Sequence, residues 1–172
     1  ERTFRLVKEM IKSKDVLTLG ELDKKEILQT IDFAIKLKHE LKKGVVKPLL
    51  KNKTLAMIFQ KPSTRTRISF ETGMFQLGGH AIHLSGQDLQ LSRGETIEDT
   101  AKTLSRYVDV VMARVYEHST LESLAENATI PVINGLSNSY HPCQILADLM
   151  TIREKKGKLD GLRMAWIGDG NN

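Results

Sequence analysis

The stretch on which the fold depends reads TLAMIFQKPSTRTR and covers residues 54–67. Its first half is an apolar run that ends at Phe59 and predicts a buried strand, and a helical pattern begins at Thr64. A strand that turns directly into a helix leaves several backbone N–H groups without intrahelical partners. The helix dipole adds partial positive charge there, and the hydroxyl and guanidinium groups of residues 63–67 add donors. The stretch therefore predicts a site for a dianionic phosphate, although Ser63 could also be a simple N-cap beside solvated arginines.

Strand and helix alternate along the rest of the chain. Strands are expected at 54–59, 81–84, 108–113, 131–133 and 163–167, and helices at 64–77, 96–107, 120–127 and 142–155. Further upstream, a helix is expected at 2–14 and a longer one from an N-cap at Asp23 to a stop at Gly44. The alternation predicts βαβ units with right-handed crossovers. The fold class is therefore α/β, with a four-stranded parallel sheet, helices on both faces, and the first strand of a second α/β domain.

The candidate binding and catalytic residues follow the ends of the predicted strands. Four strand exits lead into 63–67, into the polar loop 85–95, to Arg114, and into 134–144. In open α/β sheets, ligands bind beyond the carboxyl ends of the strands. We therefore expect these segments to meet at one edge of the sheet.

Two of the four exits carry three further candidate residues. Arg114 follows a run too apolar for the surface, so its charge needs an anionic partner, either a ligand or a structural carboxylate such as Glu117. His141 precedes Pro142, which fits the first position of a helix. The dipole of that helix disfavours protonation of His141, so a neutral imidazole could donate to a carbonyl oxygen. Gln144 could accept from an amide, and helix capping is the alternative role for both side chains.

Composition excludes several classes of function. The net charge of +5 is spread along the chain, and no basic tract carries interleaved aromatic residues, so nucleic-acid binding is not expected. No apolar run approaches the roughly 20 residues that span a membrane. The single cysteine, Cys143, fits a reducing compartment and is interpreted as a packed thiol. His80 and His83 lack further ligands at a suitable spacing, so neither a metal nor a cofactor is expected.

Four motifs together resemble the aspartate/ornithine carbamoyltransferase family over nearly the whole chain. They are STRTR at 63–67, MARVY at 112–116, HPCQ at 141–144 and WIGDGNN at 166–172. The second and last favour the ornithine enzymes over the aspartate enzymes. The resemblance implies a carbamoyl phosphate-binding domain at 1–155, then a linker and the first strand of an ornithine-binding domain at 156–172. The rest of that second domain is missing, so we expect a piece of a longer protein that is inactive alone.

The resemblance also assigns roles to individual residues. Catalysis would fall to Arg65, Arg114 and His141. Carbamoyl phosphate would be bound by Ser63, Thr64, Arg65, Thr66, Gln90, Arg114, His141 and Gln144. Gln90 would reach the site of a neighbouring subunit, Asn172 would contact the backbone groups of ornithine, and Arg93 stands where aspartate enzymes carry lysine.

The implied reaction transfers the carbamoyl group of carbamoyl phosphate to the side-chain amine of L-ornithine, giving L-citrulline and phosphate. The resemblance further implies a role in arginine biosynthesis, a cytoplasmic location, and a homotrimer or a multiple of trimers with active sites at the subunit interfaces. Three alternatives stay open: another acceptor (aspartate, putrescine or an acylated ornithine), a non-catalytic carbamoyl phosphate-binding module, and a structural or regulatory protein.

Overall fold

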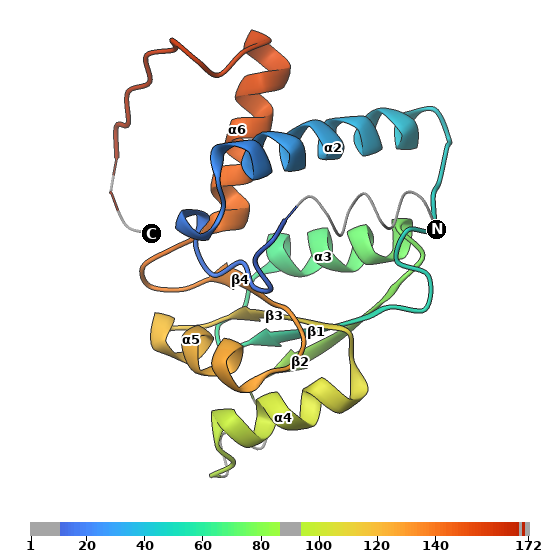
Figure 1. Ribbon diagram of the computed structural model, residues 1–172, viewed down its shortest axis with the longest axis vertical. Coiled ribbons are helices and arrows are strands. Elements are labelled where there is room, and N and C mark those ends of the chain that lie inside the picture. The colour runs from blue at the N-terminus through green and yellow to red at the C-terminus, as the bar shows by residue number, and fades with distance from the viewer. Residues whose placement is uncertain (1–10, 87–93, 169, 171–172) are drawn as a thin grey trace.

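The computed structural model describes residues 11–86, 94–168 and 170. Helices and strands follow the predicted alternation (Figure 1). In chain order they are the short 3-10 helix η1 (Leu19–Glu21), α2 (Lys24–Lys42), β1 (Thr54–Phe59), α3 (Thr64–Gln76), β2 (His80–Ser85), α4 (Ile97–Tyr107), β3 (Val110–Arg114), α5 (His118–Asn127), β4 (Val132–Leu136) and α6 (Pro142–Lys156).

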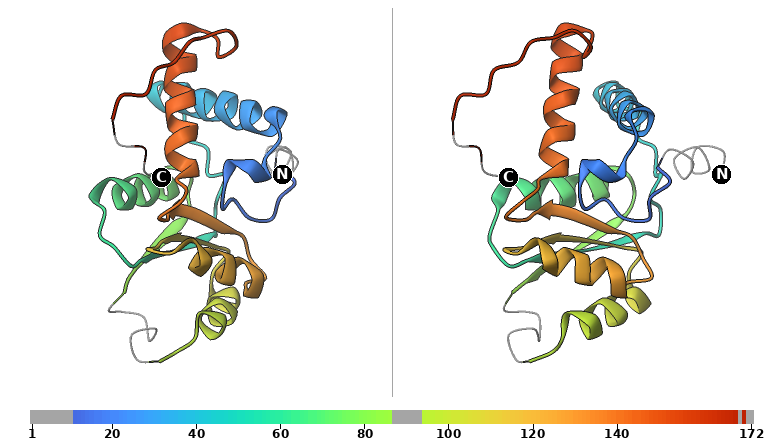
Figure 2. Two further views of the ribbon diagram at one scale, coloured as in Figure 1. Left: turned by 90° about the vertical axis from the view of Figure 1, so that its left-hand side faces the viewer. Right: turned by 60° about the vertical axis from the view of Figure 1, so that its left-hand side comes forward.

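The four strands form one parallel sheet in the order β2-β1-β3-β4. The chain leaves β1 on one side to reach β2, and then crosses back to β3 and β4 on the other side. Because right-handed crossovers in opposite directions put their helices on opposite faces, α3 covers one face and α4 and α5 cover the other (Figures 1 and 2). The predicted parallel sheet with helices on both faces is confirmed.

The central strand β1 is buried on both faces. Ala56 and Ile58 belong to the core that α4 and α5 close, whereas Leu55 and Met57 pack in a second core with Met74 of α3. A strand enclosed in this way needs an unbroken apolar sequence instead of an alternating one. This burial explains the apolar run at the start of residues 54–67.

A bulge ends the pairing of β3 with β4. Ala113 pairs with Asn134, but Arg114 pairs with Leu136, so Gly135 is left without an opposite residue. A Cβ atom at Gly135 would overlap Met112 Sδ, which explains why glycine stands there. Bulges bend the strand and re-aim the side chains that follow. This one lies at the carboxyl end of the sheet, beside Arg114.

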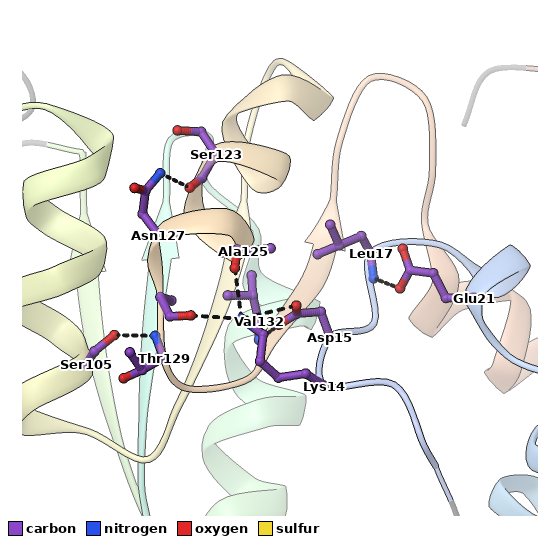
Figure 3. A network of polar contacts seen from close by, with 11 residues as sticks. Lys14, Asp15, Leu17, Glu21, Ser105, Ser123, Ala125, Asn127, Thr129 and Val132 are labelled. Carbon is purple, nitrogen blue, oxygen red and sulfur yellow. Dashed lines mark hydrogen bonds and ion pairs between the residues drawn. The ribbon is translucent and has the colours of Figure 1, made fainter.

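The outer edge of β4 is covered by the N-terminal segment. Val16 donates its N–H to Val132 O and accepts from Asn134 N, both at 2.9 Å. Lys14 Nζ donates to the carbonyl groups of Ala125 and Ala128, and Figure 3 shows this network. The sequence did not reveal this edge pairing. Residues 11–14, the described end of the helix expected at 2–14, are not helical, and residues 1–10 lie outside the described residues.

The strand expected at 163–167 is absent, so the prediction of a strand at these residues is wrong. Ile167 is 96% exposed and Met164 is 79% exposed. Within the described part of the chain no strand runs beside this segment, and an extended backbone without a partner strand forms no ladder. Residues 158–168 instead follow α6 as an irregular segment.

Candidate anion-binding site

A cavity of about 370 Å³ lies beyond the carboxyl ends of β1, β3 and β4. Its walls come from the start of α3, the end of β3, the bulge in β4 and the start of α6. The lining residues are Ser63, Arg65, Thr66, Ser69, Phe70, Arg114, Gly135, Leu136, His141, Cys143, Gln144 and Ala147. Among the residues that the structure describes, two arginines line this cavity and no carboxylate does, so its charge favours an anion.

Sheet order explains why these segments meet. The chain turns to opposite sides after β1 and after β2, so the strand order switches between β1 and β3, where a crevice opens. Phe59, the last residue of β1, pairs with Arg114, the last residue of β3. Three of the four predicted exits therefore meet in one cavity. The described part of the second exit, after β2, does not line it.

The first wall is the N-terminus of α3. Ser63 is its N-cap, with its Oγ accepting from Thr66 N at 3.3 Å and lying 3.0 Å from Thr66 Oγ1. No acidic residue occupies the first turn, so the partial positive charge of the helix end is not neutralised within it. Ser63 is thus both the N-cap and a lining residue. Thr64 is exposed and does not line the cavity.

The two arginines of the STRTR string have different surroundings. Arg65 lines the cavity and forms no ion pair with any described residue. Arg67 points elsewhere, and its Nε donates to Glu71 Oε1 at 2.9 Å, one turn along the same helix. Both arginines are exposed, as the alternative interpretation expected, but only Arg65 also lines the cavity.

Arg114 supplies the second positive charge. Its Nε is buried and has no hydrogen-bond partner among the described residues. The carboxylate of Glu117, the alternative partner, accepts from Asn138 Nδ2 instead. Burial, and then the charge of Arg65, lower the pKa of Arg114 from its ordinary value. A half-buried cation whose buried Nε has no partner among the described residues is most simply stabilised by an anion in the cavity.

His141 is the N-cap residue of α6, with Pro142 in the first helical turn as expected. Its side chain makes no capping hydrogen bond, so the capping alternative is wrong for His141. Its Nδ1 is buried without a partner in the described part of the chain. Burial and the charge of Arg114 lower the pKa of His141, against a smaller opposing effect of Asp148. The imidazole is therefore neutral at pH 7 and can donate one hydrogen bond.

Gln144 follows His141 by one turn and also lines the cavity. Its Nε2 donates to Asp148 Oδ1 at 2.9 Å, which leaves its Oε1 as an acceptor. Cys143 lies between them, and its Sγ donates to Asn134 O at 3.5 Å. Burial raises the pKa of Cys143 to about 11, so the thiol is not ionised at neutral pH and is not an activated nucleophile.

Several lining residues were not predicted from the sequence. Ser69 follows Thr66 by three residues on the same helix face, a spacing that could have identified it. Gly135 and Leu136 enter through the bulge, which no sequence signal marked. Gln90, Arg93 and Asn172 lie outside the described residues.

Across the described ranges, no helix is long and apolar enough to cross a membrane. No group of three or more histidine, cysteine, aspartate or glutamate residues in those ranges could hold a metal ion.

Comparison with protein families gives one match over most of the chain. Residues 14–154 match the model described as "Aspartate/ornithine carbamoyltransferase, carbamoyl-P binding domain". The match includes every wall of the cavity.

Individual relatives agree with this result. The chain is 66% identical over 163 residues to an ornithine carbamoyltransferase of Cenarchaeum symbiosum, covering 94% of this chain and 53% of the relative. It is 60% identical over 162 residues to one of Anoxybacillus flavithermus, covering 94% and 52%. The chain thus spans about half the length of the curated relatives it matches.

Solved structures show the same fold. An ornithine carbamoyltransferase from Pyrococcus furiosus matches with a TM-score of 0.90 and 58% identity, over 92% of this chain and 51% of that one. The catalytic subunit of an M. jannaschii aspartate transcarbamoylase matches with a TM-score of 0.81 and 36% identity, over 87% and 50%.

Proposed function

The chain belongs to the aspartate/ornithine carbamoyltransferase family, and on that premise we propose that it forms the carbamoyl phosphate-binding part of an ornithine carbamoyltransferase. The complete enzyme would transfer the carbamoyl group to the side-chain amine of L-ornithine, giving L-citrulline and phosphate. One observation carries the proposal: the described residues that line the cavity at the strand switch point include two arginines and no carboxylate. We assign residues 1–155 to the carbamoyl phosphate domain and 156–172 to the connection towards an ornithine-binding domain.

The phosphate group binds at the start of α3 in this proposal. Unpaired backbone N–H groups, the helix dipole and the hydroxyl groups of Ser63 and Thr66 favour a dianion there, whereas a contact from the exposed Thr64 rests on the resemblance alone. Arg65 adds a guanidinium that can form two parallel hydrogen bonds with phosphate oxygens. The same contacts stabilise the phosphate as it leaves.

The carbamoyl carbonyl oxygen lies towards Arg114 and His141, where Thr66 also reaches. When the ornithine amine attacks the carbon, negative charge grows on this oxygen. A donor already in place can stabilise that charge by roughly 3–4 kcal/mol. A neutral His141 acts as a donor here and not as a base, and no residue of this chain is needed as a covalent nucleophile.

The carbamoyl amide points to Gln144, whose free oxygen accepts from it while Asp148 holds the other end of the side chain. Two further assignments rest on the resemblance alone. Gln90 would contact the carbamoyl phosphate of a neighbouring subunit, and Asn172 would contact ornithine. Holding both reactants in contact accounts for much of the remaining rate enhancement.

Ornithine is the acceptor that the relatives favour. The chain is 58% identical to the Pyrococcus furiosus ornithine enzyme but 36% identical to the M. jannaschii aspartate enzyme. Aspartate, putrescine and acylated ornithine are the other candidates that an acceptor assay distinguishes.

We further propose a role in arginine biosynthesis, a homotrimer with shared active sites and a cytoplasmic location. The family membership supports the first two. A single cysteine, of intermediate burial and in no disulfide, fits a reducing compartment.

Citrulline formation by the full-length protein tests the proposal. Arg65→Ala and Arg114→Ala should each lower kcat at least about 100-fold, because each removes a preplaced donor, while circular dichroism shows an unchanged fold. Arg106→Ala, an exposed arginine on α4 remote from the cavity, is the matched control and should stay within about twofold of wild type. Near wild-type rates in either cavity variant would refute the assignment.

A further inference from the structure

The position of Arg114 depends on the backbone around it. Its Nε is buried without a hydrogen-bond partner among the described residues, so no side chain of that part anchors this atom. The neighbouring residue Val115 is fully buried and donates its N–H to Leu136 O at 2.9 Å. The other side of the strand end faces β1, where Gln60 follows the last paired residue.

Gln60 contacts the backbone on both sides of Arg114. Its N–H donates to Arg114 O at 2.9 Å, and its side-chain Oε1 accepts from Tyr116 N at 2.9 Å. Regular pairing of β1 with β3 ends at Phe59 and Arg114, so no strand residue is opposite Tyr116 N. The Gln60 side chain extends the ladder by one residue beyond the end of the sheet.

The same turn is held by a second contact. Lys61 Nζ lies over the Tyr116 ring, 5.1 Å from its centroid, which is within the range of a cation–π interaction. Tyr116 is 56% exposed, and its carbonyl oxygen accepts from Asn138 N at 2.9 Å on the β4 side. The segment after β1 therefore holds the segment after β3 through one acceptor and one cation.

We propose, resting on the function above, that Gln60 is a positioning residue, whose side-chain oxygen fixes the turn after β3 and so holds the Arg114 guanidinium at the carbamoyl phosphate. Neither the comparisons nor the cavity lining assigns Gln60 a role, because it does not line the cavity. A displacement of about 1 Å in a catalytic group can lower the rate on the order of 100-fold, so a weaker hold on this turn has a measurable effect.

Two substitutions at Gln60 distinguish the effect of its hydrogen-bond acceptor from the effect of its side-chain length. Gln60→Met keeps the length but cannot accept from Tyr116 N, whereas Gln60→Glu keeps an acceptor. We expect Gln60→Met to weaken carbamoyl phosphate binding by about five- to tenfold, and Gln60→Glu to stay within about threefold of wild type at 0.15 M salt, where surface charge is screened. NMR titration of the 172-residue chain measures these constants into the millimolar range.

A double-mutant cycle with Arg114→Ala distinguishes positioning from general destabilisation. If Gln60 acts through Arg114, adding Gln60→Met to Arg114→Ala changes the dissociation constant by less than twofold. Equal weakening in both backgrounds, or no weakening by Gln60→Met alone, would overturn the inference but leave the proposed function intact. An unchanged dissociation constant in Arg114→Ala would instead overturn the proposed site, and this inference with it.

Discussion

At the scale of single residues, the site is built from groups without partners. Arg65 has no ion pair among the described residues, and Arg114 Nε and His141 Nδ1 are buried without hydrogen bonds there. Arg114 Nε and His141 Nδ1 are costly to leave unpaired, because burial has removed both atoms from water, whereas Arg65 is exposed. Their cost is offset when an anion with several acceptor oxygens binds. These residues therefore favour ligand binding over stability of the unliganded chain.

His141 makes this cost measurable through pH. Because burial and the charge of Arg114 lower its pKa below the ordinary value of 6.5, the unfolded chain binds a proton that the folded chain resists. Stability then falls as the pH decreases from 6.5 towards the lowered pKa. We expect the free energy of unfolding of the wild type to decrease more between pH 7.5 and pH 5 than that of His141→Gln, as measured by urea unfolding. Parallel pH curves for the two proteins would contradict a lowered pKa of His141.

The sequence identified most of these residues, and the reasons are physical. Arg114 was found because a charge after a buried strand needs an anionic partner, and His141 because Pro142 marks a helix start. The sequence also suggested Glu117 as an alternative partner of Arg114, which is wrong, because closeness in sequence does not show where a side chain points. The role of Gln60 could not be predicted, since it depends on which strand lies beside β1.

At the scale of elements, the apolar runs located the strands and the turn residues located the helices. β1 agrees with its predicted bounds, but β4 continues to Leu136, three residues past the prediction, because Asn134 and Gly135 resemble loop residues. Val108 and Asp109 are not in β3, since Val108 is the C-cap of α4 and the Asp109 carboxylate accepts from Thr54 N at 2.9 Å. The start of β3 therefore depends on a contact between the Asp109 side chain and β1, which the sequence pattern does not show.

The bulge at Gly135 gives a prediction at this scale. In Gly135→Ala the added Cβ overlaps Met112 Sδ and lies 3.3 Å from Ala113 O, and Met112 is fully buried and has little space to move. We expect a loss of about 1–3 kcal/mol in the free energy of unfolding, together with weaker carbamoyl phosphate binding.

Gly73→Ala is the matched control, because its Cβ would meet nothing within 4 Å and it lies inside α3. Alanine there should leave stability unchanged or raise it by up to about 1 kcal/mol. Urea unfolding compares the two variants, and a Gly135→Ala chain as stable as the wild type would show that the bulge tolerates a side chain.

At the scale of the whole molecule, strand order brings the site together. The alternation of elements predicted a parallel sheet, and the rule on strand ends predicted one shared edge. The order β2-β1-β3-β4 was not predictable from periodicity, because the same pattern fits several orders. That order explains why β1, β3 and β4 supply the cavity and the described exit of β2 does not.

The most direct test is a crystal structure of this chain with carbamoyl phosphate or its stable analogue phosphonoacetamide. We predict the phosphate or phosphonate group at the start of α3 within hydrogen-bond distance of Ser63, Arg65 and Thr66. The carbonyl oxygen should contact Arg114 and His141, and the amide should contact Gln144. A ligand bound away from the strand switch point, or an empty cavity at saturating ligand, would contradict the proposal.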